Sequence, residues 1–237
     1  MPVSPPSTSA PSAQVVPPSA EPHGSAPVEQ YAPVETGPRR WLILVILALT
    51  QLLVVLDGTI VNIALPQAQV ELGLTDTQRQ WVVTAYALAF GALLLLGGRV
   101  ADYWGRKRTY LLGMVGFGVA SLLAGLARNG TELVAMRGLQ GVFAALLAPA
   151  ALALLTVSFP RGRDRNTAFA VFGSVAGVGA AVGLVLGGAL TEFADWRWCL
   201  WVNVPVVVVA LVAGQLLIRG PKERLLPQGD QVAVHLG

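Results

Sequence analysis

The sequence predicts an all-α integral membrane protein with six transmembrane helices, and three observations lead to this fold class. The first is composition: 54% of the 237 residues are hydrophobic and only 12% are charged, whereas soluble domains carry about 25% charged residues. The second is that the apolar residues form six long runs. The third is that most Lys and Arg residues are gathered in short clusters between these runs, which is typical of a topology signal.

Each apolar run is long enough to form one transmembrane helix. In chain order the runs are Trp41–Leu65, Gln80–Gly98, Thr109–Ala127, Thr131–Ser158, Asn166–Thr191 and Cys199–Ile218. Each has about 19 residues or more, and a helix of that length crosses a hydrocarbon core of about 30 Å. Because the runs are continuous rather than alternating, they favour helices over the strands of a membrane barrel.

The chain outside the spans has a different composition. Residues 1–38 contain ten of the sixteen prolines and no Lys or Arg, so they cannot bury enough apolar surface to order themselves and are predicted to form a disordered cytoplasmic tail. Residues 39–219 are predicted to form the six-helix transmembrane domain. We interpret residues 220–237 as the cytoplasmic start of a truncated connecting loop, which favours a fragment of a longer protein over a self-sufficient unit.

The basic residues are distributed unevenly between the two sides of the membrane. Twelve of the sixteen lie before the first span, in the loops after the second and fourth spans, or after the last span, and three lie in the other loops. Since cytoplasmic loops carry the excess of Lys and Arg, both termini are expected in the cytoplasm of a multi-pass plasma-membrane protein. The basic pI of about 9.4 then reflects topology, and no nucleic-acid partner is expected.

The sequence offers no set of residues for catalysis or metal binding. Cys199 is the single cysteine, and His23 and His235 lie near opposite ends of the chain, which argues against a disulfide framework and a metal site. No Ser/His/Asp or Cys/His set and no phosphate-binding loop is present. We therefore expect no enzyme activity, no catalytic residues, no bound metal and no cofactor.

Asp57 and Arg137 are the only charged residues well inside a predicted span. Asp57 lies eight residues before Leu65, or about 12 Å along a helix, and Arg137 lies six residues after Thr131, or about 9 Å. Both therefore belong at a similar depth in the outer half of the bilayer, where an isolated charge costs about 2.5–3.5 kcal/mol. Two interpretations stay open: a structural ion pair, or a proton relay in which Asp57 binds and releases a proton.

Two further motifs stand between and within the spans. The loop "GGRVADYWGRKR" combines glycines that allow a tight turn with a basic cluster that anchors the turn on the cytoplasmic side. The fifth span repeats glycine every fourth residue at Gly179, Gly183 and Gly187, which leaves one bare helical face. This face is either an ordinary tight packing surface or a sliding contact between moving helices.

Taken together, these segments resemble the N-terminal portion of the major facilitator superfamily, specifically its fourteen-helix drug:proton antiporter family. "LDGTIVNIALP" is similar to the motif of helix 1, "GRVADYWGRKR" to that of loop 2–3, "RGLQG" to that of helix 4 and "GAAVGLVLGG" to that of helix 5. "WRWCLWVNVP" resembles the segment that enters helix 6. Tyr103 replaces a common basic residue, and Leu184 replaces the usual proline of helix 5.

The resemblance implies the N-terminal half of a facilitator fold and a proton-coupled secondary transporter that exports drugs or other small amphipathic compounds, with the proton gradient as its energy source. It implies a proton-coupling and transport group made of Asp57, Arg137, Asn62 and Gln140. It implies a conformational latch made of Gly98, Asp102, Gly105, Arg106, Lys107 and Arg108. It also implies a helix interface, around which the two halves rock, made of Gly179, Gly183, Gly187 and Gly188.

The implied partners are a small-molecule substrate, protons and the lipid bilayer. A missing C-terminal half, or a second copy of the chain, is needed to close the transport pathway. Two alternatives remain at this point: a half-size transporter that works as a homodimer, and a non-transporting membrane remnant.

Overall fold

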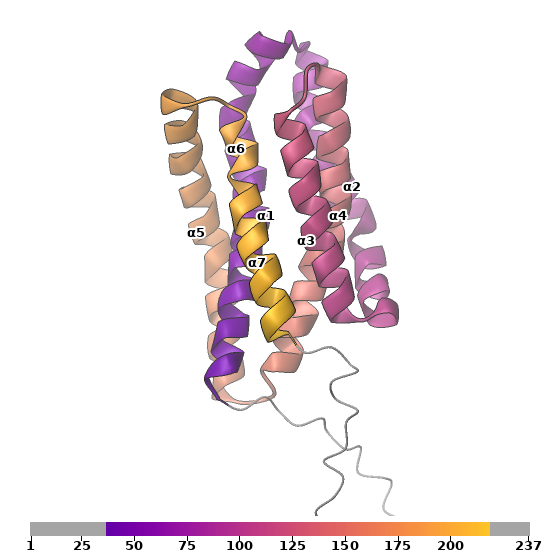
Figure 1. Ribbon diagram of the computed structural model, residues 1–237, viewed down its shortest axis with the longest axis vertical. Helices are drawn as coiled ribbons and strands as arrows, with labels where there is room; N and C mark the ends of the chain where they lie inside the picture. The colour runs from indigo at the N-terminus through magenta and orange to yellow at the C-terminus, as the bar shows by residue number, and fades with distance from the viewer. Residues whose placement is uncertain (1–36, 219–237) are drawn as a thin grey trace, which may run out of the picture. The chain divides into compact units, whose positions relative to one another are not determined.

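The computed structural model describes residues 37–218, and the regular structure in this range is entirely α-helical (Figure 1). The elements are α1 (Pro38–Leu72), α2 (Asp76–Trp104), α3 (Arg106–Gly125), α4 (Gly130–Ser158), α5 (Arg163–Phe193), α6 (Trp198–Trp201) and α7 (Asn203–Leu217). Six helical segments of this range are long and apolar enough to cross a membrane, with α6 and α7 forming the last one. The predicted fold class is confirmed. The predictions for the tail and for the final loop concern residues outside the described range, except that Gly37 and Pro38 are included and Pro38 begins α1.

The helices extend beyond the apolar runs that predicted them. Helix α1 continues past Leu65 and through Pro66, and it ends at Gly73, whose φ of +62° is a left-handed conformation suited to glycine. Helix α2 begins with a capping box, because the Thr75 hydroxyl accepts from the backbone N–H of Gln78 at 3.2 Å and the Gln78 side chain accepts from the Thr75 N–H at 3.1 Å. Polar residues therefore form the helix ends, which hydropathy alone does not detect.

The last span is interrupted near its start. Helix α6 ends at Trp201, and α7 begins two residues later at Asn203, while Val202 between them keeps helical dihedral angles. Pro205 follows within the first turn of α7 and has no N–H to donate to the carbonyl of Trp201. The interruption places a polar residue, Asn203, at the beginning of α7.

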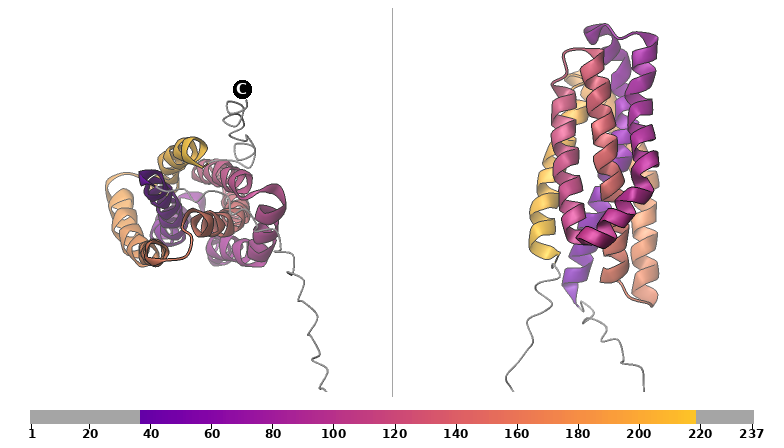
Figure 2. Two further views of the ribbon diagram at one scale, coloured as in Figure 1. Left: turned by 90° about the horizontal axis from the view of Figure 1, so that it is seen from below. Right: turned by 90° about the vertical axis from the view of Figure 1, so that its right-hand side faces the viewer.

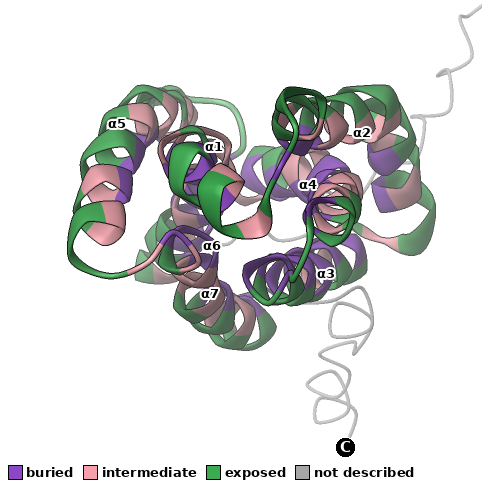
Figure 3. Ribbon diagram, turned by 90° about the horizontal axis from the view of Figure 1, so that it is seen from above, coloured by how far each residue is buried: buried purple, intermediate pink, exposed green. Residues whose placement is uncertain are grey.

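The six spans run alongside one another (Figure 2), and helices of the first three spans pack against helices of the last three. Helix α4 packs mainly against α2 and α3, whereas α1 packs mainly against α5, and α7 contacts both α3 and α1. From above, α1 and α4 lie between α5 and α2 (Figure 3). The six spans form two groups of three in chain order, namely α1, α2 and α3, and then α4, α5 and the α6–α7 span. The second helix of each group, α2 or α5, packs on the first helix of the other group. In the apolar parts of α2 and α5 only 17% and 11% of residues are buried, so both helices expose most of their apolar surface.

Helices α2 and α4 approach closely enough for their backbones to touch. A Cβ atom at Gly97 of α2 would overlap the carbonyl oxygen of Ala145, and one at Gly141 of α4 would overlap that of Tyr86. Glycine at both positions lets the two helices cross in contact. This contact fixes the distance between the helix that carries Tyr86 and the helix that carries Arg137.

Polar contacts join the helix ends. At one end, Arg39 donates to the Leu217 carbonyl at 3.0 Å, so the beginning of α1 and the end of α7 lie together. At the other end, the guanidinium of Arg197 pairs with Glu71, whose second oxygen accepts from the Trp196 indole at 2.7 Å. The partly exposed Arg197–Glu71 ion pair contributes about 0–1 kcal/mol, so the main effect of these contacts is to fix which helix ends meet.

Candidate functional site

The two charges inside the spans form a buried ion pair. Asp57 of α1 is 0% exposed and Arg137 of α4 is 1% exposed, and Arg137 Nη1 donates to Asp57 Oδ2 at 2.6 Å. The depth argument placed both residues at the same level, and the structure agrees with it. Because buried charges are costly unless paired, each residue stabilises the other.

Two amide side chains complete the coordination of the Asp57 carboxylate. Gln140 lies three residues after Arg137 and therefore on the same face of α4, and its Nε2 donates to Asp57 Oδ1 at 2.7 Å. Its Oε1 accepts from Arg137 Nη1, also at 2.7 Å. From α7, Asn203 Nδ2 donates to Asp57 Oδ1 at 2.8 Å. The carboxylate accepts three hydrogen bonds, which suits an ionised carboxylate because it has no donor of its own.

Helix α3 joins this network through Ser121. The Ser121 hydroxyl accepts from Asn203 Nδ2 at 3.0 Å and from Gln140 Nε2 at 3.3 Å, and it donates to the Leu200 carbonyl at 2.8 Å. Both amides thus touch the carboxylate on one side and Ser121 on the other.

Helix α2 contributes an aromatic face. The Arg137 guanidinium carbon lies 4.3 Å from the centroid of the Tyr86 ring, within the range of a cation–π interaction, and Arg137 Nε donates to the Val82 carbonyl at 3.4 Å. The Tyr86 hydroxyl is buried and has no hydrogen-bond partner among residues 37–218. The site therefore combines one anion, one cation, polar amides and an aromatic ring from α1, α2, α3, α4 and α7.

The site contains a single carboxylate, and its charge governs the contacts around it. No group of three or more His, Cys, Asp or Glu side chains within the described range could hold a metal ion. A proton added to Asp57 would remove the negative charge that balances Arg137 and would turn an acceptor into a donor. One proton thus changes both the electrostatics and the hydrogen bonding of five helices.

The structure does not bring Asn62 into this group. Asn62 lies five residues after Asp57 on α1, which rotates it by about 140° around the helix, and its side chain is exposed and donates to the Gly58 carbonyl at 2.8 Å. It lines a separate pocket of about 450 Å³ together with Arg79 and Thr84. Gln140, in contrast, contacts both Asp57 and Arg137, and the transport roles of Asn62 and Gln140 both stay predictions.

The latch residues lie at and around the turn between α2 and α3. Gly105 forms this turn with a φ of +97°, and Gly98 lies about two turns earlier on α2, where a Cβ would lie 3.9 Å from Pro149. Lys107 donates to the Gln215 carbonyl at 3.2 Å. The side chains of Asp102, Arg106 and Arg108 are exposed. No hydrogen bond or ion pair joins the Asp102 side chain to another residue of the described range, and the latch stays a prediction.

Three of the four predicted interface glycines lie where α5 packs against α1. A Cβ at Gly179 would lie 3.1 Å from Leu52, one at Gly187 would lie 3.0 Å from Ile60, and one at Gly183 would overlap the Thr59 hydroxyl. At Gly188 nothing lies within 4 Å of such a Cβ. The bare face is thus a tight seam inside the six-helix unit, and the rocking role remains untested.

Gly183→Ala is expected to lower the free energy of unfolding by about 1 kcal/mol, the lower end of the overpacking range, since the Thr59 side chain can turn away. Gly188→Ala is the matched control on the same helix, and it should be neutral or slightly stabilising because alanine favours helix. Thermal unfolding of the purified variants in detergent measures both. Equal stabilities would show that the seam tolerates a methyl group.

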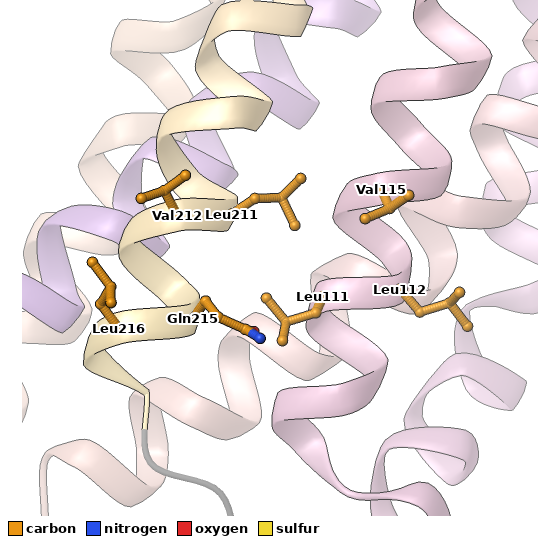
Figure 4. Close-up of a pocket in the computed structure, with 7 residues that line it drawn as sticks. All are labelled: Leu111, Leu112, Val115, Leu211, Val212, Gln215 and Leu216. Carbon is orange, nitrogen blue, oxygen red and sulfur yellow. The ribbon is translucent and has the colours of Figure 1, made fainter.

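A groove of about 610 Å³ lies between α3 and α7 (Figure 4). Its lining is apolar apart from one amide, and its residues are Leu111, Leu112, Val115, Leu211, Val212, Gln215 and Leu216. None of the predicted site residues lines it.

Sequence reasoning missed three residues of the network: Tyr86, Ser121 and Asn203. A usable signal existed, because Ser121 and Asn203 are isolated polar residues with apolar neighbours, such as "VNVP" for Asn203. That segment contributed only to the family resemblance. A systematic search for buried polar residues in the spans would have found both.

Comparisons with known proteins agree with this fold. The Major Facilitator Superfamily family model matches residues 47–235. The chain is 59% identical over 195 residues to the puromycin resistance protein pur8 of Streptomyces alboniger, covering 82% of this chain and 39% of that protein. It is 43% identical over 181 residues to the cephamycin export protein CmcT of Amycolatopsis lactamdurans, covering 76% and 37%. The chain thus spans about two fifths of the length of these curated relatives.

Solved structures show the same fold. The peptide transporter POT in complex with sulfate matches with a TM-score of 0.66 at 16% identity, covering 78% of this chain and 39% of that chain. A bacterial homolog of the human lysosomal transporter Spinster matches with a TM-score of 0.64 at 20% identity, covering 77% and 43%. The exchanged packing of two groups of three helices is the arrangement expected for the inverted repeats of this fold. The chain belongs to the Major Facilitator Superfamily and forms the N-terminal six-helix half of that fold.

Proposed function

We propose that this chain supplies the N-terminal half of a proton-coupled antiporter that exports antibiotics or other small amphipathic compounds across the plasma membrane, with both termini in the cytoplasm. Export is supported by the relatives, which are named for puromycin resistance and cephamycin export. Proton coupling is supported by one observation above all: the buried Asp57 carboxylate, which accepts from Arg137 Nη1 at 2.6 Å. An ionisable residue inside the membrane marks an ion pathway by default.

The proposed cycle uses the two charge states of this site. With Asp57 ionised, its pair with Arg137 joins α1 to α4 through the 2.6 Å contact. A proton on Asp57 weakens that attraction, and Arg137 keeps its contact with the Tyr86 ring. The favoured arrangement of the helices then differs between the two charge states, which is the requirement for coupling proton movement to a conformational change.

The exposed helices support a larger assembly. Helices α2 and α5 leave most of their apolar residues uncovered, and transporters of this fold place the substrate site between two halves near the bilayer midplane. A second six-helix half, or a second copy of this chain, would cover these helices and close the pathway, with lipid on the remaining faces. Cavity residues from both sides would then select the substrate.

The test is proton-driven export by the native gene product in an export-deficient bacterium. Asp57→Asn keeps the size of the side chain but cannot carry a proton, so we expect efflux of puromycin to fall to the level of cells without the transporter. Glu192→Gln neutralises an exposed carboxyl of α5 and should export normally. Equal efflux by wild type and Asp57→Asn under an imposed pH gradient would refute coupling through Asp57.

A further inference from the structure

Besides the Tyr86 hydroxyl, one further atom of the buried site has no hydrogen-bond partner among the described residues, and it belongs to Asn203. Asn203 is fully buried, and its Nδ2 donates to Asp57 Oδ1 at 2.8 Å and to the Ser121 hydroxyl at 3.0 Å. Its carbonyl oxygen Oδ1 has no hydrogen-bond partner among the described residues. A buried acceptor without a partner costs free energy, so it calls for a physical reason. The orientation of the amide follows from Asp57, because an ionised carboxylate accepts hydrogen bonds only.

Protonation of Asp57 creates an O–H donor, and the unpartnered Oδ1 of Asn203 can accept its hydrogen bond. Three donors converge on the carboxylate, from Arg137, Gln140 and Asn203, and a protonated carboxyl brings a fourth donor into the same space. Arg137 has no acceptor to offer, and the Gln140 oxygen already accepts from Arg137 at 2.7 Å. Asn203 is the one residue touching the carboxylate whose oxygen is unused.

We propose that Asn203 is a positioning residue that follows the charge of Asp57: when Asp57 takes up a proton, the Asn203 carboxamide turns over and Oδ1 accepts the new O–H. This rests on the proposed function, in which Asp57 is the proton carrier. A hydronium ion of the pathway gives its proton to Asp57 Oδ1 and leaves as water, so the carboxylate becomes a neutral carboxyl. The terminal torsion of asparagine is broad, and the turn needs no movement of the helix.

The turn keeps two hydrogen bonds on Asn203, but Nδ2 and the Leu200 carbonyl lose the bonds that they have in the ionised state. In the ionised state Nδ2 donates twice, to Asp57 and to Ser121. After the turn Oδ1 accepts twice, from Asp57 and from Ser121, whose hydroxyl rotates away from the Leu200 carbonyl that it contacts at 2.8 Å. Among the described residues, the titratable and charged groups that face this position are Asp57 on α1, Arg137 on α4 and Tyr86 on α2. Protonation of Asp57 thereby changes the hydrogen bonds of Ser121 on α3 and Asn203 on α7, two helices that carry no charged residue near the carboxylate.

The test is pH-difference infrared spectroscopy of the full chain in lipid nanodiscs. The carboxyl band of protonated Asp57 is assigned by its loss in Asp57→Asn. In Asn203→Leu the O–H has no acceptor, so this band should shift to higher frequency. Gln67→Leu is the matched control, because it removes an amide of α1 that donates to the Thr191 carbonyl and not to the network, and it should leave the band in place.

A second measurement needs no substitution in the network. The chain has four asparagines, Asn62, Asn129, Asn166 and Asn203, and with isotope-labelled asparagine a labelled amide band should change at the pH where the Asp57 band appears.

Asn203→Thr retains a donor and an acceptor and should keep the Asp57 band near its wild-type frequency.

An unshifted Asp57 band in Asn203→Leu, a silent asparagine label, or the absence of any Asp57 band while the chain stays folded would each overturn the proposal. These spectra do not depend on export. Normal efflux with Asp57→Asn would refute the proposed function alone, and a coupled asparagine signal could still be present.

Discussion

Arg137→Met is expected to lower the free energy of unfolding by about 3–5 kcal/mol and to abolish export, because removing one partner of a buried ion pair leaves the other charge uncompensated. The substitution keeps a long unbranched side chain in the space of Arg137 and removes its contacts with the Asp57 carboxylate and the Tyr86 ring. Thermal unfolding of the purified protein and efflux from cells measure the two effects separately.

The double variant Asp57→Asn/Arg137→Met provides the decisive comparison. It removes both charges, so it should recover most of the lost stability, since no buried charge is then left unpaired. It should not recover export, because the proton carrier is gone. Arg128→Met changes an exposed cation near the start of α4 and should alter stability by no more than about 0.5 kcal/mol. Equal stability of the single and double variants would show that the pair does not stabilise the fold.

Gly97→Ala is expected to cost about 3 kcal/mol, the upper end of the overpacking range, because the new methyl group would overlap the backbone carbonyl of Ala145. Backbone atoms cannot turn away as the Thr59 side chain can at Gly183. Helices α2 and α4 must separate, and the contact between Tyr86 and Arg137 should loosen with them.

Gly91→Ala is the control for this substitution. Gly91 lies on the same helix, and nothing lies within 4 Å of a Cβ placed there. This variant should be unchanged or more stable by up to about 1 kcal/mol, the helix preference of alanine over glycine. Thermal unfolding of the two proteins in one detergent tests the pair, and similar losses at both positions would argue against the α2–α4 backbone contact.

Hydropathy was sufficient to find the six spans, but it located their ends poorly. The apolar run of the second span begins at Gln80, whereas α2 begins at Asp76 because Thr75 and Gln78 cap it. Likewise α1 continues through Pro66 to Leu72. Capping is a local polar effect that leaves no trace in a hydrophobicity average, so the loops are shorter than the apolar pattern suggests.

The sequence predicted the relative depth of the site residues, but it did not predict which helices lie next to one another. Residue counting placed Asp57 and Arg137 at one depth, and the structure joins them directly. Counting cannot show which helices are neighbours, so the contributions of Ser121 from α3 and Asn203 from α7 depended on the observed packing. The same limitation applies to Asn62, which lies close to Asp57 in sequence but faces a different pocket.

The separation of the ion-pair partners along the chain has a consequence for biosynthesis. Arg137 follows Asp57 by 80 residues, and a ribosome that adds about 5–20 residues per second needs roughly 4–16 s to cover that distance. Helix α1 therefore leaves the translation machinery with its carboxyl group before its cation exists, and Asn203 follows later still, 146 residues after Asp57. Until α4 is inserted, the nascent α1 either stays beside the insertion channel or enters the lipid with Asp57 protonated. Once α4 is inserted, Arg137 can pair with the ionised Asp57.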